Sequence, residues 1–119
     1  RGSTVCKQTC DFVFPIDPVP GESTVIGVVA TNVALDVVQA QRVAIMAQDG
    51  IARAVRPAHA PFDGDTIFAM ATGEKPLQGA SQLGMIGMMA ADCVARAIAR
   101  GIYNASSLGS NVSYRSLFG

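Results

Sequence analysis

The chain has 119 residues, of which 50% are hydrophobic and only 15% are charged. This length limits it to one domain, and a free domain normally carries more charge, roughly a quarter of its residues. Nine basic and nine acidic side chains cancel, so nucleic-acid binding receives little support. The composition indicates a chain that is buried against a larger structure.

The cysteines favour a reducing compartment. There are three, Cys6, Cys10 and Cys93, with no signal peptide pattern before them. The pair in CKQTC can supply two metal ligands or a local disulfide, but a metal site needs further ligands, and His59 is the only histidine. We expect a cytoplasmic protein without a metal or a cofactor.

The first 23 residues differ from the rest. The segment DFVFPIDPVPG contains prolines at positions 15, 18 and 20, which fix φ and remove backbone donors, so it predicts an extended linker. The run TVIGVVAT (24–31) then predicts a strand that is apolar on both faces. Such a strand needs a layer of structure above and below the sheet.

A helix is expected to begin near Asp36, a favourable N-cap, because apolar residues follow at helical spacing until Pro57. Asp49 and Arg53 are four residues apart and are expected to pair on its surface. A loop over residues 56–65 leads to a second buried strand.

That strand, TIFAMAT (66–72), is expected to end at Gly73. An apolar helix should then run from about residue 81 to 103; its charges recur on one face, which favours a buried amphipathic helix over a membrane span. The tail NVSYRSLF (111–118) predicts a short final strand. Two or three strands and two helices cannot cover a sheet that is apolar on both faces, so the chain is expected to be part of a larger fold.

The loop before the second strand carries the acidic candidates. FDGDT places Asp63 and Asp65 two residues apart, a spacing that suits a hydrogen-bond relay or general acid/base work. The structural alternative is that Asp63 shapes the turn before Gly64 and Asp65 accepts from loop amides. Arg56 and His59 are close enough in sequence to pair with either carboxylate.

Two hydroxyl residues, Ser23 and Thr24, precede the first strand. A histidine-based triad is not favoured, because His59 lies in a proline-rich loop and the chain has no GxSxG motif. A chain that is cut directly before a hydroxyl residue supplies its own base, since the new α-amine titrates near neutral pH. Such a nucleophile belongs at the start of a central strand, which is the position of Thr24.

The runs TVIGVVATNVAL and AQRVAIMAQDGIARAVRPAHAPFDGDTIFAMATG resemble the small β-subunit of DmpA-type L-aminopeptidase/D-esterases. This family includes the β-peptidyl aminopeptidases and the nylon-oligomer hydrolase NylC. The resemblance covers residues 24 to about 118, and its most specific pieces are GVVAT, RAVRPAHAPFDGDT and FAMATG. The excess of arginine over lysine, with abundant alanine and valine, indicates a GC-rich genome, and the resemblance is to an actinobacterial member.

The resemblance implies a precursor that cleaves itself at the Ser23–Thr24 bond and then uses Thr24 as its N-terminal nucleophile. Asp63 and Asp65 fall on the family's acidic pair, in a form similar to the NylC branch, and would orient the amine or relay protons. Arg56 and His59 are possible supporting residues. Ser23 is an alternative nucleophile if the cut falls after Glu22.

The implied fold is α/β, part of an αββα sandwich of the DmpA and ornithine acetyltransferase type. The α-subunit of the same precursor would complete it, in αβ units that associate further. Residues 1–23 are then a linker or the end of the α-subunit, and residues 24–119 are the catalytic β-subunit. The expected substrate is a peptide or small amide, with no nucleic acid or membrane as partner.

Two other functions stay open. The chain can be an uncleaved, inactive family member that serves as an assembly or binding module. It can also be an acyltransferase, as in the similarly folded ornithine acetyltransferases.

Overall fold

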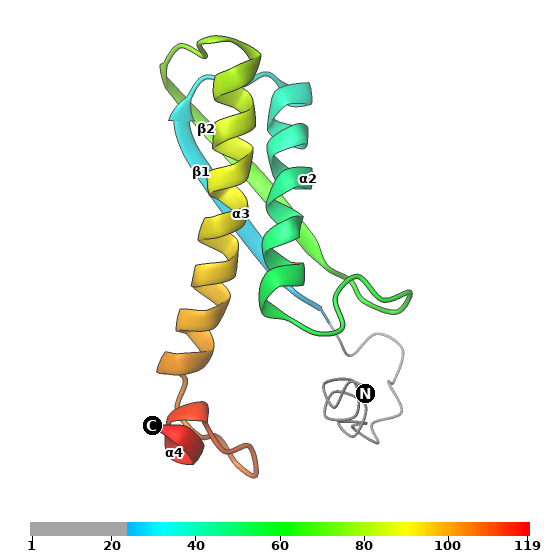
Figure 1. Ribbon diagram of the computed structural model, residues 1–119, viewed down its shortest axis with the longest axis vertical. Helices are drawn as coiled ribbons and strands as arrows, with labels where there is room; N and C mark the ends of the chain where they lie inside the picture. Colours follow the sequence, from blue (N-terminus) through cyan, green and yellow to red (C-terminus); the bar gives the residue numbers. More distant parts are fainter. Residues whose placement is uncertain (1–23) are drawn as a thin grey trace, which may run out of the picture.

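A computed structural model describes residues 24–119 of the chain, so the predicted linker and Ser23 lie outside the described residues. Figure 1 shows the order of the elements, which confirms the predicted succession of strand, helix, strand and helix. They are β1 (Ile26–Val33), α2 (Val37–Ala54), β2 (Thr66–Lys75), α3 (Gly79–Asn104) and α4 (Tyr114–Phe118).

The two strands form a parallel pair, with Val28 opposite Phe68. Parallel strands need a crossover connection, which α2 provides. Both strands therefore begin at the same end of the sheet, where the Thr66 N–H donates to the Val25 carbonyl over 2.8 Å. This topology brings the loop that precedes β2 next to the residues that precede β1 (Figure 1).

The start of α2 follows the prediction. The Asp36 carboxylate accepts from the Gln39 N–H, and the Gln39 side chain accepts from the Asp36 N–H, which makes a complete capping box. The expected pair of Arg53 with Asp49 is wrong, because Arg53 instead forms an ion pair with Asp92 on α3. The two helices are close enough for this contact to form between them.

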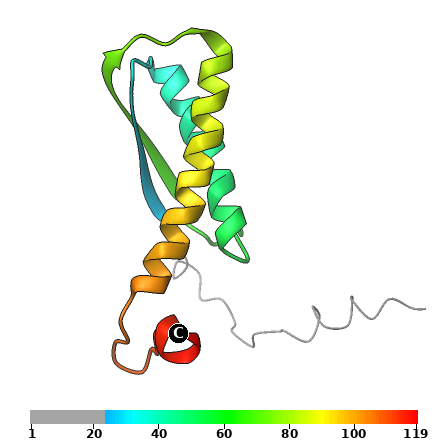
Figure 2. The same cartoon turned by 60° about the vertical axis from the view of Figure 1, so that its left-hand side comes forward.

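Both long helices cover one face of the sheet, as Figure 2 shows from the side. The residues buried between them are mostly aliphatic: Val43, Ala47, Ile51, Ile67, Ala90 and Val94. Small residues set the spacing of the helices, since a Cβ added at Gly50 would run into the Ala91 carbonyl oxygen. One helical layer and one sheet layer thus share a single core.

The other face of the sheet is bare within the part of the chain that the structure describes. Side chains at every second position point away from the helices, and they remain more than half exposed: Ile26 70%, Val28 58%, Phe68 56% and Met70 58%. Exposed apolar patches are typical of surfaces that bind another protein, a membrane or a ligand. The mixed α/β class is confirmed, and its completion by a partner subunit stays a prediction.

The helix α3 is long and apolar enough to cross a membrane by length and composition alone, a property that core helices of soluble proteins share. In this structure it packs along α2 and contacts β1, with 22% of its most apolar window buried. Its solvent-facing side includes Met85, Met88 and Met89, which are more than half exposed.

Two predictions about the second half of the chain are also wrong. Gly73 does not end β2; it takes a φ of 75° within the strand, near the irregularity in register between Thr31 and Val33. The tail forms the short helix α4 in place of a strand, because the Ser113 hydroxyl accepts from the Ser116 N–H and starts a helical turn.

Candidate active site at the start of the sheet

Thr24 is exposed two residues before the start of β1, and its side chain lies against the loop that leads into β2. A Cβ added at Gly64 would sit 2.8 Å from Thr24 Oγ1 and 3.4 Å from its Cγ2. The threonine hydroxyl therefore rests on the backbone of Gly64, the residue between Asp63 and Asp65. The structure brings the predicted nucleophile and the predicted acidic loop into one site.

Asp65 joins this loop to the start of β1. Its carboxylate is nearly buried, with 6% of the side chain exposed. One oxygen, Oδ1, accepts from the Val25 N–H over 2.9 Å, across 40 residues of sequence. The other, Oδ2, accepts from the His59 N–H over 3.1 Å and lies 3.1 Å from His59 Nδ1. Asp65 thus fixes the amide that follows Thr24.

Asp63 makes shorter-range contacts. Its Oδ2 accepts from the Ala60 N–H over 2.7 Å, and its own N–H donates to the Ala60 carbonyl over 2.9 Å. These two bonds close a turn within the loop. Asp63 therefore shapes the turn, as the structural alternative predicts. Asp65 accepts from a loop N–H, that of His59, and also makes the long-range hydrogen bond to the Val25 N–H.

The two supporting candidates differ. His59 adopts a φ of 57°, a left-handed conformation in which histidine occurs more often than most residues, and it contacts Asp65. Arg56 is exposed and forms no ion pair with Asp63 or Asp65 among the residues that the structure describes. The site as described therefore contains Thr24, the acidic loop and His59, without Arg56.

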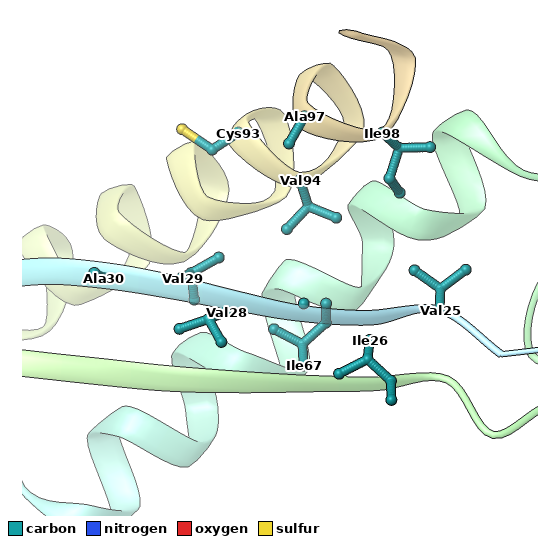
Figure 3. Close-up of a pocket in the computed structure, with 11 residues that line it drawn as sticks. Val25, Ile26, Val28, Val29, Ala30, Ile67, Cys93, Val94, Ala97 and Ile98 are labelled. Atoms are coloured by element: carbon teal, nitrogen blue, oxygen red, sulfur yellow. The ribbon is translucent and has the colours of Figure 1, made fainter. Parts of the chain in front are cut away.

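An apolar groove of about 410 Å³ begins beside this site. It runs between β1 and α3, and Figure 3 shows Val25, Val29, Val94 and Ile98 directed into it. Its lining resembles a protein core, and it follows the edge of β1 that does not pair with β2. The groove has the character of an unfilled packing space and lacks the polar groups that orient a substrate.

No cluster of three or more His, Cys, Asp or Glu side chains that could hold a metal ion occurs within residues 24–119. Cys6 and Cys10 lie outside the described residues, and Cys93 is exposed on α3.

Two features of the site escaped sequence reasoning. The close approach of Gly64 to Thr24 needs the crossover topology, although a glycine between two aspartates is a signal of a tight backbone approach. The Val25 N–H as the partner of Asp65 has no sequence signal, because it depends on the register of the two strands.

The family of this chain follows from its similarity to known proteins. The profile of peptidase family S58 matches residues 2–114, nearly the whole chain. The chain belongs to peptidase family S58. The match begins before residue 24, the first residue of the resemblance described above.

Curated relatives of this S58 chain occur in mycobacteria. An uncharacterized aminopeptidase of Mycobacterium tuberculosis is 43% identical over 107 residues, which cover 81% of this chain and 31% of the relative. An uncharacterized aminopeptidase of Mycobacterium leprae is 39% identical over 123 residues, which cover 94% of this chain and 34% of the relative. The chain therefore spans about a third of the length of these relatives.

Proposed function

We propose that this S58 chain is the catalytic part of a self-processing amide hydrolase, in which Thr24 becomes the N-terminal nucleophile after cleavage of the Ser23–Thr24 bond. The observation that carries the proposal is the contact of the Thr24 hydroxyl with Gly64, between the two aspartates at the start of the sheet. The aminopeptidase names of the mycobacterial relatives support an enzyme that hydrolyses peptide or amide bonds.

Self-processing would begin with attack of Thr24 Oγ1 on the carbonyl carbon of Ser23. The hydroxyl proton passes to the nitrogen as the Ser23–Thr24 C–N bond breaks, so the nitrogen becomes a free α-amine and the acyl group moves to the hydroxyl oxygen as an ester. Water then hydrolyses the ester, which leaves a carboxylate on Ser23 and restores the hydroxyl of Thr24. Asp65 supports this step by holding the Val25 N–H, which is bonded to the Thr24 carbonyl carbon.

The mature site would hydrolyse a substrate amide in two steps. The α-amine of Thr24 takes the hydroxyl proton while Oγ1 attacks the substrate carbonyl, and the departing amine receives that proton. Water, deprotonated by the same α-amine, then hydrolyses the acyl-enzyme. Asp63 and Asp65 would orient the α-amine, and part of the oxyanion hole would come from outside the described residues.

The rest of the protein is the proposed partner of the bare sheet face. Ile26 and Val28 on β1, with Phe68 and Met70 on β2, form an exposed apolar surface on this face. Residues two apart on a strand share a face, so Thr24 lies at the end of this surface. A second layer placed there, such as the α-subunit of the same precursor, would also form one side of the active site. Further association of αβ units and a cytoplasmic location remain proposals.

The test compares Thr24→Ala with the unchanged full-length protein by intact mass. We expect the unchanged protein to separate into two chains and Thr24→Ala to stay in one piece, because the variant has no hydroxyl to attack. Thr24→Ser should still process, and Thr72→Ala, an exposed threonine on β2 away from the site, serves as the control. Processing that survives Thr24→Ala would overturn the proposal.

Activity assays separate the alternative functions. Hydrolysis of amino-acid p-nitroanilides or short amide oligomers by the processed protein, lost by at least about 10³-fold when Thr24 is replaced, supports the hydrolase. Acyl transfer to an added amine in preference to water would favour an acyltransferase. Absence of both processing and hydrolysis would favour an assembly module.

A further inference from the structure

His59 contacts the Asp65 carboxylate at two places, through its backbone N–H, which donates a hydrogen bond, and through its ring nitrogen Nδ1. Its backbone N–H and its ring nitrogen Nδ1 both lie 3.1 Å from the same carboxylate oxygen, Oδ2. The left-handed backbone at His59, with a φ of 57°, accompanies this contact.

The opposite oxygen of the same carboxylate holds the start of β1. Asp65 Oδ1 accepts from the Val25 N–H over 2.9 Å, and only 6% of the Asp65 side chain is exposed. A nearly buried carboxylate is held in one orientation by its hydrogen bonds. His59 on one oxygen therefore determines where the other oxygen meets the backbone that carries Thr24.

We propose that His59 is a positioning residue for Thr24, which acts through Asp65: Nδ1 donates to the carboxylate, and the carboxylate fixes the peptide group between Thr24 and Val25. This role rests on the proposed function of Thr24. In this role the imidazole orients the Asp65 carboxylate through Nδ1 and transfers no proton through Nε2. His59 needs no contact with the reacting atoms in this role.

The contribution of the ring can be separated from that of the backbone with two variants. His59→Gly keeps access to the left-handed conformation and removes the ring. His59→Asn also tolerates that conformation, and its side-chain amide supplies a donor near the place of Nδ1 while it lacks any counterpart of Nε2. His59→Ala, which strains the backbone and lacks the donor, completes the series.

The experiment measures the rate of self-processing by intact mass in the full-length protein, and kcat and KM for an amino-acid p-nitroanilide after processing. We expect His59→Gly to slow processing and lower kcat by about tenfold or more, as for the loss of a hydrogen bond to a charged group, with little change in KM. His59→Asn should recover most of both rates. Thermal unfolding and circular dichroism are measured on every variant to compare their folding.

Two results would overturn the role of His59. Rates of His59→Gly equal to those of the unchanged protein would show that the ring is dispensable. Rates of His59→Asn as low as those of His59→Gly, in a folded protein, would show that the donor at the Nδ1 place is not what matters. The proposed function fails separately, when the unchanged protein does not process or when Thr24→Ala still does.

Discussion

At the end of the sheet where both strands begin, a nearly buried carboxylate, Asp65, ties the loop to β1. At the opposite end the chain is held by exposed contacts: the Ala34 N–H donates to the Lys75 carbonyl over 2.7 Å, and the Asp36 capping box starts α2. The contacts at the second end are those that any strand-to-helix connection requires. The first end has a longer-range polar arrangement, in which one carboxylate joins positions 40 residues apart.

This difference indicates that the two ends of the sheet have different roles in folding and in catalysis. A buried carboxylate is costly unless its oxygens are paired, and at Asp65 the partners belong to residues next to the proposed nucleophile. Substitutions at the starting end should therefore change chemistry more than folding. Those at the finishing end should change folding alone.

The largest effect within this comparison is expected from Asp65→Ala. The change removes the acceptor of the Val25 and His59 N–H groups, so we expect the free energy of unfolding to fall by about 1–3 kcal/mol. Processing should slow by about 10²-fold or more, because the backbone at Thr24 loses its anchor. Asp63→Ala removes only a local turn contact and should lose less in both measurements.

Intact-mass time courses and urea unfolding of the two aspartate variants measure these effects. Equal losses in Asp63→Ala and Asp65→Ala would show that the loop acts as a unit and that the long-range bond of Asp65 has no separate role.

A smaller effect is expected from Gly64→Ala. Its new Cβ would lie 2.8 Å from Thr24 Oγ1, so the hydroxyl of this exposed threonine would have to turn away from its position, and misplacement of the nucleophile should slow processing by about tenfold. Gly84→Ala on α3 is the matched control, because a Cβ there meets nothing within 4 Å. If both alanine variants process at the same rate as the unchanged protein, the contact between Gly64 and Thr24 does not matter to the reaction.

The smallest effect is expected at the finishing end, from Asp36→Ala. Loss of the capping box should lower the free energy of unfolding by about 1 kcal/mol in urea titrations. Processing should keep its rate, because the cap is at the far end of β1 from Thr24. A marked slowing of processing by Asp36→Ala, in a protein that remains folded, would remove the distinction between the two ends.

The sequence predicts the end of the sheet near Asp36 better than the end near Asp65. Asp36 as N-cap and the two strands could be predicted because caps and apolar runs are local signals. The start of the sheet depends on the parallel register, which places residue 65 beside residue 25 and has no local signal. The family resemblance named Thr24, Asp63 and Asp65, but which backbone groups their carboxylates bind needed the structure.

The two incorrect predictions about the second half of the chain have different physical causes. Gly73 does not end β2, because its φ of 75° accommodates an irregularity in the ladder and the strand continues to Lys75. The tail is a helix and not the predicted strand because Ser113 caps a helical turn, and Tyr114 packs near Tyr103 with ring centroids 6.3 Å apart. The pairing of the strands decides the first place, and a local cap decides the second.

The most direct test of the central claim is N-terminal sequencing of the chains obtained from the purified full-length protein. The account predicts a chain whose first residue is Thr24, and its loss in the Thr24→Ala variant. A new chain that begins at Ser23, or a full-length protein that hydrolyses amides while the Ser23–Thr24 bond stays intact, would contradict it.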